Sequence, residues 1–314
     1  MILMALKLLV TGASVYWLLT LTDLRIAWQS ITAVPVLIIF LAVCIMLAGF
    51  VVGSFRWWLL LRHAASTIRY RKILPSYYLG IFFNNILPTT MGGDVIRTLH
   101  LSLRGISPKA LIGSTIIDRV IGLFTILALG FVCIGLSSEI VVRKSDRLVI
   151  MGVGALVATA IGVLFNARFL GLIQRLAAAY QHTRIRKFLL ETIQLCHSYK
   201  SAHAQLLAAA GLTVLMQSAV IFSYYMLGKA VGITLPLFTY FGIIPLVFLA
   251  GAIPISLGGI GVREGALVGL LIAIGVNTHL AVALSFLFLF VLLIASLPGS
   301  LVMLFSRTDR NSPP

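Results

Sequence analysis

The chain has 314 residues, of which 60% are hydrophobic and 10% are charged, and its mean hydropathy is +1.09. These values exclude a soluble globular or disordered protein and indicate one integral membrane domain over residues 1–314. The net charge of +16 lies mostly between apolar stretches, where it indicates orientation signals and contacts with anionic lipids rather than nucleic-acid binding.

Six apolar stretches are long enough to cross a bilayer, so the sequence predicts six full spans. They cover about residues 2–21, 34–61, 110–136, 148–165, 206–227 and 280–305. A basic cluster follows the second span, and short loops rich in Lys and Arg stay cytoplasmic. The cluster consists of Arg62, Arg69, Arg71 and Lys72. We therefore expect both termini of the chain in the cytoplasm.

The first of two broken segments covers residues 73–104. Pro88 removes a backbone donor and Gly92-Gly93 weaken a helix, so the chain is predicted to unwind between two short apolar arms. Basic residues flank the segment on both sides, which favours a re-entrant hairpin that enters and leaves at the cytoplasmic face. A single kinked span that crosses the bilayer is the alternative.

Residues 168–200 carry six Lys or Arg residues together with apolar residues at helical spacing. This pattern predicts an amphipathic basic helix on the cytoplasmic membrane surface. A connector that only carries orientation charge is the alternative.

The second broken segment, residues 236–277, repeats the spacing of Pro, Gly-Gly and Arg found 166 positions earlier. The residues concerned are Pro88, Gly92, Gly93 and Arg97 in the first segment and Pro254, Gly258, Gly259 and Arg263 in the second. Three full spans separate the segments, so the two hairpins are expected to enter from opposite faces. The sequence therefore predicts an all-α polytopic membrane protein with an inverted repeat, an arrangement typical of a binding site near the bilayer midplane.

Three acidic residues, Asp94, Asp118 and Glu264, fall inside predicted membrane segments, where a carboxylate is costly and usually faces a partner or a wet cavity. Asp94 could instead cap the helix after Gly93, and all intramembrane charges could pair as structural ties between spans. Arg97 and Arg263 each start a half-helix, and we expect both to face one cavity and bind a phosphate group.

The predicted substrate-binding residues share a position on or beside the two breaks, or an intramembrane charge. They are Asn84, Asn85, Pro88, Gly92, Gly93, Asp94, Arg97, Asp118, Arg119, Pro254, Ser256, Gly258, Gly259, Arg263 and Glu264.

The two motifs also resemble a known family, the membrane domain of lysylphosphatidylglycerol synthases and the small stand-alone flippase-like proteins of that superfamily. The matching positions are Asn85, Pro88, Gly92, Gly93 and Arg97 in the first motif and Pro254, Gly258, Gly259, Gly261 and Glu264 in the second. The resemblance covers nearly the whole chain and implies lipid translocation between leaflets, in a bacterial inner membrane. The soluble aminoacyltransferase domain of the full synthases is not in this sequence, so we do not expect lysyl transfer.

We therefore expect a flippase or transporter for an anionic phospholipid or a polyprenyl-phosphate-linked lipid, with membrane lipids as partners. We expect no nucleic-acid partner, no cofactor, no metal site and no catalytic residues. Two alternatives stay open: a membrane-embedded transferase with Asp94, Asp118 or Glu264 as base, and a membrane subunit that regulates a partner enzyme. A homo-oligomer also stays open.

Overall fold

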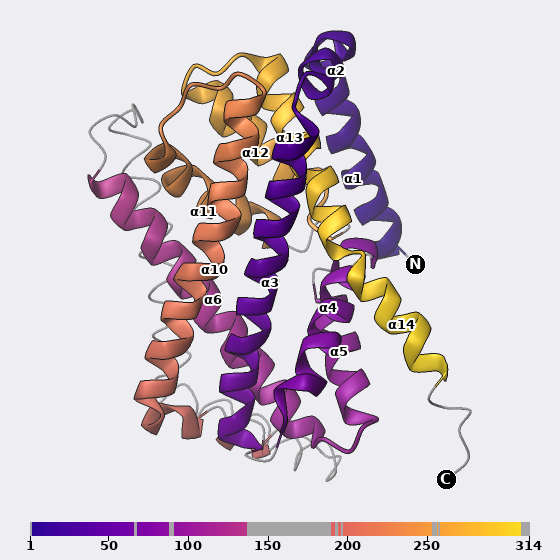
Figure 1. The fold of residues 1–314 in the computed structure, drawn as a ribbon, viewed down its shortest axis with the longest axis vertical. Helices are drawn as coiled ribbons and strands as arrows, with labels where there is room; N and C mark the ends of the chain where they lie inside the picture. The colour runs from indigo at the N-terminus through magenta and orange to yellow at the C-terminus, as the bar shows by residue number, and fades with distance from the viewer. Residues whose placement is uncertain are drawn as a thin grey trace.

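A computed structural model of the chain describes residues 2–65, 68–87, 91–136, 190–191, 194–195, 197–252, 256 and 258–308 (Figure 1). Its elements in these ranges are all helical, which confirms the predicted all-α class. They are α1 (Ile2–Thr20), α2 (Leu24–Thr32), α3 (Val36–Ala64), α4 (Tyr70–Ile86), α5 (Gly92–Ser102), α6 (Pro108–Leu136), the short 3₁₀ helix η1 (Tyr199–Ser201), α10 (His203–Ala230), α11 (Leu237–Ala252), α12 (Val262–Ala273), α13 (Thr278–Ser296) and α14 (Pro298–Thr308).

Four stretches of helix in the described ranges are long and apolar enough to cross a membrane: Val36–Ala64, Pro108–Cys133, His203–Ala230 and Thr278–Leu304. They coincide with four of the six predicted spans. The predicted first span, 2–21, is also helical, as α1. The predicted span 148–165 and most of the predicted surface segment 168–200 lie outside the described residues, so six spans and a surface helix stay predictions.

The first broken segment forms a hairpin of two helices, α4 and α5. The two helices pack antiparallel. Asn84 Oδ1 near the end of α4 accepts a hydrogen bond from Gly93 N at the start of α5 at 2.9 Å, and Ser76 Oγ, earlier in α4, bonds to His100 Nδ1, later in α5, at 2.7 Å. Gly93 lies directly against the carbonyl of Gly80. The chain therefore reverses direction at the predicted break, unlike a single kinked span, and glycine permits this close approach of backbones.

The second broken segment, α11 followed by α12, also reverses the chain. Gly258, Gly259 and Gly261 have φ angles of 59°, 82° and 85°, which lie in the left-handed region that side chains other than glycine rarely adopt. A Cβ atom on Gly259 would lie 2.9 Å from the carbonyl oxygen of Gly251 in α11. The glycine run is thus needed both for the turn and for the packing of the two helices.

The two hairpins occupy opposite ends of the helix bundle (Figure 1). Along the chain, the hairpin α4/α5 joins α3 to α6, and it lies in the lower half of the view. The hairpin α11/α12 joins α10 to α13, and it lies in the upper half. Helices α3 and α10 pack side by side in opposite directions, since Arg56 bonds to Thr213 and the more C-terminal Leu60 to the more N-terminal Tyr199.

The order of a long helix, a hairpin and a second long helix occurs twice, as α3–α6 and as α10–α13. The first three helices of each set have lengths of 29, 17 and 11 residues and of 28, 16 and 12 residues. Packing contacts correspond as well: α4 contacts α13 as α11 contacts α6, and α3 contacts α13 as α10 contacts α6. The two halves of the described bundle thus share one arrangement.

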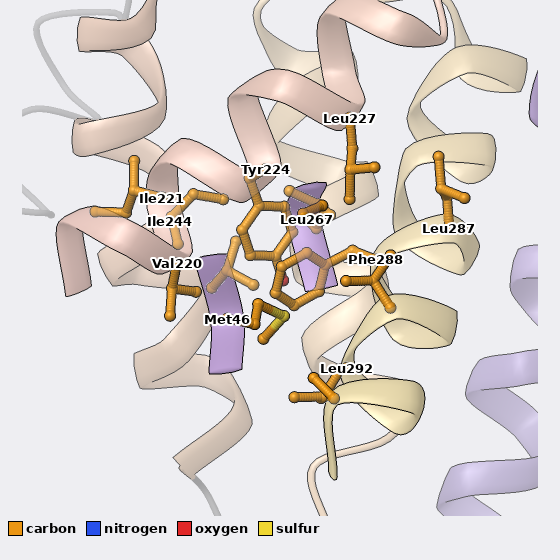
Figure 2. Close-up of a cluster of buried hydrophobic side chains, with 14 of the residues drawn as sticks. Met46, Val220, Ile221, Tyr224, Leu227, Ile244, Leu267, Leu287, Phe288 and Leu292 are labelled. Atoms are coloured by element: carbon orange, nitrogen blue, oxygen red, sulfur yellow. The ribbon is translucent and has the colours of Figure 1, made fainter. Parts of the chain in front are cut away.

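The main hydrophobic core fixes the second hairpin against the long helices. Figure 2 shows side chains from α3, α10, α11, α12 and α13 gathered around Tyr224 and Phe288, whose rings stack at a centroid distance of 3.4 Å. Met46 of α3 and Leu267 of α12 are both nearly completely buried beside them. Dense packing of this kind holds the hairpin helices in place relative to α3 and α10.

We expect that Gly93→Ala weakens the fold, because the new Cβ atom would overlap the Gly80 carbonyl and lie 2.6 Å from Asn84 Cγ. Overpacking of this kind typically costs about 1–3 kcal/mol. The matched control is Gly211→Ala in α10, where the new Cβ atom meets no heavy atom within 4 Å. Thermal unfolding in detergent should show a lower Tm for Gly93→Ala and an unchanged or higher Tm for Gly211→Ala. Equal Tm values for the two variants would contradict the close hairpin packing.

Candidate functional site

A cluster of buried charges joins α3, α5 and α6. The Asp118 carboxylate accepts a hydrogen bond from Arg56 Nε at 2.7 Å, and its second oxygen lies 3.3 Å from Arg97 Nη2. The side chains of Arg56, Arg97 and Asp118 are at most 6% exposed. A buried charge is tolerated only when it is paired, so Asp118 ties the two arginines together.

Asp94 forms the outer part of the same cluster. One carboxylate oxygen lies 3.0 Å from Arg97 Nε, and the other accepts a hydrogen bond from Arg119 Nε at 2.7 Å. The Asp94 side chain is 13% exposed and that of Arg119 is 48% exposed. Asp94 therefore links the buried part of the cluster to its accessible edge.

Aromatic rings and a hydroxyl group fix the two buried guanidinium groups. Arg97 Cζ lies 4.1 Å from the ring centroid of Trp57 and 5.3 Å from that of Tyr77. Arg56 Nη1 donates a hydrogen bond to Thr213 Oγ1 of α10 at 3.0 Å. Stacking and a planar set of donors suit arginine far better than lysine.

The cluster lines a cavity of about 450 Å³. Its polar wall carries three guanidinium groups and two carboxylates, which leaves one positive charge in excess when all are ionised. Its other walls are largely apolar and come from α4, α6, α10 and α11. The apolar lining residues are Ile81, Met91, Leu123, Ile126, Met216, Phe248, Leu249 and Ala252. The cavity thus combines an anion-attracting side with room for apolar groups.

Five of the residues predicted from the sequence line this cavity: Asn84, Asp94, Arg97, Asp118 and Arg119. The helix cap that the sequence offered for Asp94 is supplied instead by Asn84, which accepts from the amide of Gly93. The Asp94 carboxylate lies on two guanidinium groups. Asp118 and Arg119 are adjacent on a helix, so their side chains point in different directions. They contact separate partners, Arg56 and Asp94.

The two glycine breaks meet at the end of α4. A Cβ atom on Gly258 would lie 2.8 Å from the Asn84 carbonyl oxygen. Gly92 and Gly93 are buried at the start of α5, and Gly259 is buried at the second break. The Asn85 Nδ2 and Ser256 Oγ atoms are buried and have no hydrogen-bond partner among the described residues. Pro88 and Pro254 themselves lie outside the described residues.

Arg263 and Glu264 form a separate pair. Glu264 Oε1 lies 2.6 Å from Arg263 Nη2, and its Oε2 accepts a hydrogen bond from the amide of Gly261 at 2.7 Å. Neither side chain is among the residues that line the cavity. Arg97 thus lines the cavity in this structure, whereas Arg263 does not, because Glu264 and the turn of the second hairpin hold Arg263. A substrate-binding role for either arginine stays a prediction.

Arg56 lines the cavity as well, although it belongs to neither of the two sequence motifs. Its position inside an apolar helix without an acidic neighbour in that helix was the available signal, since such an arginine needs a partner on another helix. Trp57 and Tyr77, which stack on Arg97, carried no comparable signal.

The comparison with known families matches residues 4–299 to the lysylphosphatidylglycerol synthase TM region. This chain belongs to that family. The match confirms the resemblance predicted from the two Pro/Gly-Gly/Arg motifs and, with the four membrane-length helices, makes the chain an integral membrane protein. No curated protein matches the chain. Membership in the lysylphosphatidylglycerol synthase TM-region family suggests a lipid-related function.

Proposed function

We propose that this protein moves an anionic, phosphate-bearing lipid between the two leaflets of a bacterial inner membrane. An anionic phospholipid and a polyprenyl-phosphate-linked lipid both have this chemistry. The observation that carries the proposal is the cavity of about 450 Å³, in which buried arginines face an apolar wall. A lipid phosphate would meet the guanidinium groups, and the adjoining chain would lie along α10 and α11.

Electrostatics support an anionic substrate. The cluster carries one positive charge in excess, and its guanidinium groups can bind a phosphate with paired N–H donors. A phosphodiester carries one negative charge, which would balance the excess. A neutral or cationic head group would leave it uncompensated.

The repeated arrangement of helices supports transport. Two hairpins inserted at opposite ends of the bundle, each between two long helices, fit an inverted-topology repeat, and such repeats place binding sites near the midplane and permit alternating access. The meeting of Gly258 with the Asn84 carbonyl brings the two breaks together beside the cavity. In this proposal the hairpins are re-entrant, and rocking of one half against the other exposes the cavity to each leaflet in turn.

The contacts of the three carboxylates argue against the alternative of a membrane-embedded transferase. A general base must be basic enough to take a proton from the substrate, and ion pairs with arginine make a carboxylate less basic. Asp94 and Asp118 each contact two arginines, and Glu264 contacts Arg263 and the amide of Gly261. All three carboxylates are thus engaged in ion pairs, which suits positioning and charge balance better than proton abstraction.

The orientation of the hairpins can be tested by labelling single cysteines with a reagent that does not cross membranes. We place the end of the bundle that carries Arg62, Arg69, Arg104 and Lys109 in the cytoplasm, following the bias of short basic loops. In a background without native cysteines, Arg69→Cys and Ser107→Cys should react from the cytoplasmic side. Thr234→Cys and Asn277→Cys, at the mouth of the second hairpin, should react from the other side. Reaction of Arg69→Cys and Ser107→Cys from different sides would exclude a re-entrant first hairpin.

Transport can be tested with fluorescent lipids in liposomes that contain the purified protein. Wild-type protein should speed translocation of fluorescent phosphatidylglycerol over that in empty liposomes, whereas Arg97→Lys should lose at least about tenfold in rate at equal folded protein. Lysine keeps the charge but cannot contact Asp94, Asp118 and the Trp57 ring together. The control is Arg25→Lys in the exposed helix α2, which should leave the rate unchanged.

Wild-type liposomes that translocate no faster than empty ones would argue against the transport proposal. Normal transport by Arg97→Lys would remove the paired-donor role of Arg97. Full rescue of Arg97→Ala by a second change, Asp94→Ala, would leave a structural ion pair in its place.

A further inference from the structure

We propose that the Asp94 carboxylate occupies the position that the substrate phosphate takes, and that the lipid phosphate binds by displacing it from Arg97 and Arg119. This inference rests on the proposed function, since it names how the transported lipid is held. It assigns different roles to two carboxylates that the sequence alone does not distinguish. The substrate phosphate replaces Asp94 on its arginines, whereas Asp118 keeps its arginine contacts throughout.

The contacts of Asp94 resemble those of a bound anion. Its two oxygens lie on two different guanidinium groups, 3.0 Å from Arg97 Nε and 2.7 Å from Arg119 Nε. It lines the cavity, and it is the third residue of α5, where the first-turn amides and the helix dipole favour negative charge. A phosphate group that replaced it would meet the same donors.

Asp118 lacks this freedom. Its side chain is 4% exposed, against 13% for Asp94, and both of its oxygens face the fully enclosed Arg56 and Arg97. Removal of one partner from such a buried pair leaves an uncompensated charge. We therefore assign Asp118 the task of holding Arg56 and Arg97 in place, whichever anion occupies the outer position.

The two arginines that hold Asp94 differ in exposure. Arg97 is fixed by Asp118, Trp57 and Tyr77, so its guanidinium keeps its place when Asp94 leaves. The side chain of Arg119 is 48% exposed at the cavity edge, where an incoming head group can reach it. The displaced carboxylate stays at the start of α5, beside the first-turn amides, so it does not become an isolated charge.

Competition by Asp94 has a consequence for transport. A lipid phosphate bound to these guanidinium groups without a competing carboxylate would leave slowly, whereas a carboxylate that returns to the same donors offsets part of that binding energy. Removal of the charge at position 94 should therefore tighten phosphate binding and slow release. This combination distinguishes a competitor from a residue that only stabilises the arginines.

The test measures binding to wild-type protein and variants in a phosphate-free maltoside detergent by isothermal titration calorimetry. The probes are dihexanoylphosphatidylglycerol, which is water-soluble, and inorganic phosphate. Asp94→Asn should lower the Kd for dihexanoylphosphatidylglycerol by about tenfold, because one close competitor for the guanidinium groups is gone. Asp94→Glu, which keeps the charge, should stay within about threefold of wild type. The double variant Asp94→Asn/Arg119→Gln should lose the gain.

Two charge-matched controls make the result specific. Asp118→Asn removes the same charge from the same cluster, and Glu191→Gln removes it outside the cavity, from a carboxylate that pairs with Lys109. Neither should tighten binding, and thermal unfolding shows which variants remain folded. An equal gain for Asp94→Asn and a folded Asp118→Asn, or for Glu191→Gln, would overturn the proposal in favour of general electrostatics. No gain for Asp94→Asn would overturn it as well.

The two probes distinguish the source of the phosphate. A gain for the lipid, with or without a gain for inorganic phosphate, supports displacement of Asp94 by a head group. A gain for inorganic phosphate alone would overturn the assignment to a lipid. Binding is measured without transport, so the two proposals can fail separately. No translocation together with tighter binding by Asp94→Asn would contradict the transport function and support the anion site. Translocation without tighter binding by Asp94→Asn would contradict only the displacement of Asp94.

Discussion

The structure depends on one constraint: charged side chains within the apolar bundle must find partners on neighbouring helices. Asp118 meets this need for Arg56 and Arg97 at once, and it thereby joins α3, α5 and α6. Arg56 extends the connection to Thr213 of α10. Because an unpaired charge there costs several kcal/mol, the positions of four helices relative to the cavity follow from a few polar contacts. The hydrophobic core around Tyr224 and Phe288 then fixes the second hairpin against this frame.

The two halves of the bundle share an arrangement of helices but differ in chemistry. In the first half, the arginine after the glycine pair contacts acids on its own helix and on the next long helix, and it faces the cavity. In the second half, Arg263 contacts the adjacent Glu264, and the hairpin helix α11 gives the cavity Phe248 and Leu249. When the two halves are aligned with the 166-residue offset of the motifs, the position of Asp118 corresponds to the buried Leu284. The first half thus supplies most of the charged wall of the cavity, and the second half supplies much of the apolar wall.

Local signals in the sequence were sufficient for the breaks and for part of the site. Pro and Gly-Gly predicted where the helices end, because these residues act on the backbone of their own segment. Asp94, Arg97, Asp118 and Arg119 were found because intramembrane charge is costly wherever it lies. Their partners depend on tertiary packing, so the sequence could not show that Asp118 pairs with Arg56, that Asn84 caps α5 or that Glu264 holds Arg263. A repeated motif predicted equal roles for Arg97 and Arg263, whereas the neighbouring side chains give the two arginines different surroundings.

The most direct test of the account is an experimental structure of the protein in nanodiscs that contain phosphatidylglycerol. The account predicts a lipid phosphate inside the cavity, within hydrogen-bond distance of the Arg97 and Arg119 guanidinium groups, with the acyl chains along Met216, Phe248 and Leu249. Lipid head groups confined to the outer surface, with the cavity closed to lipid and the Asp94 pairs unchanged, would contradict it.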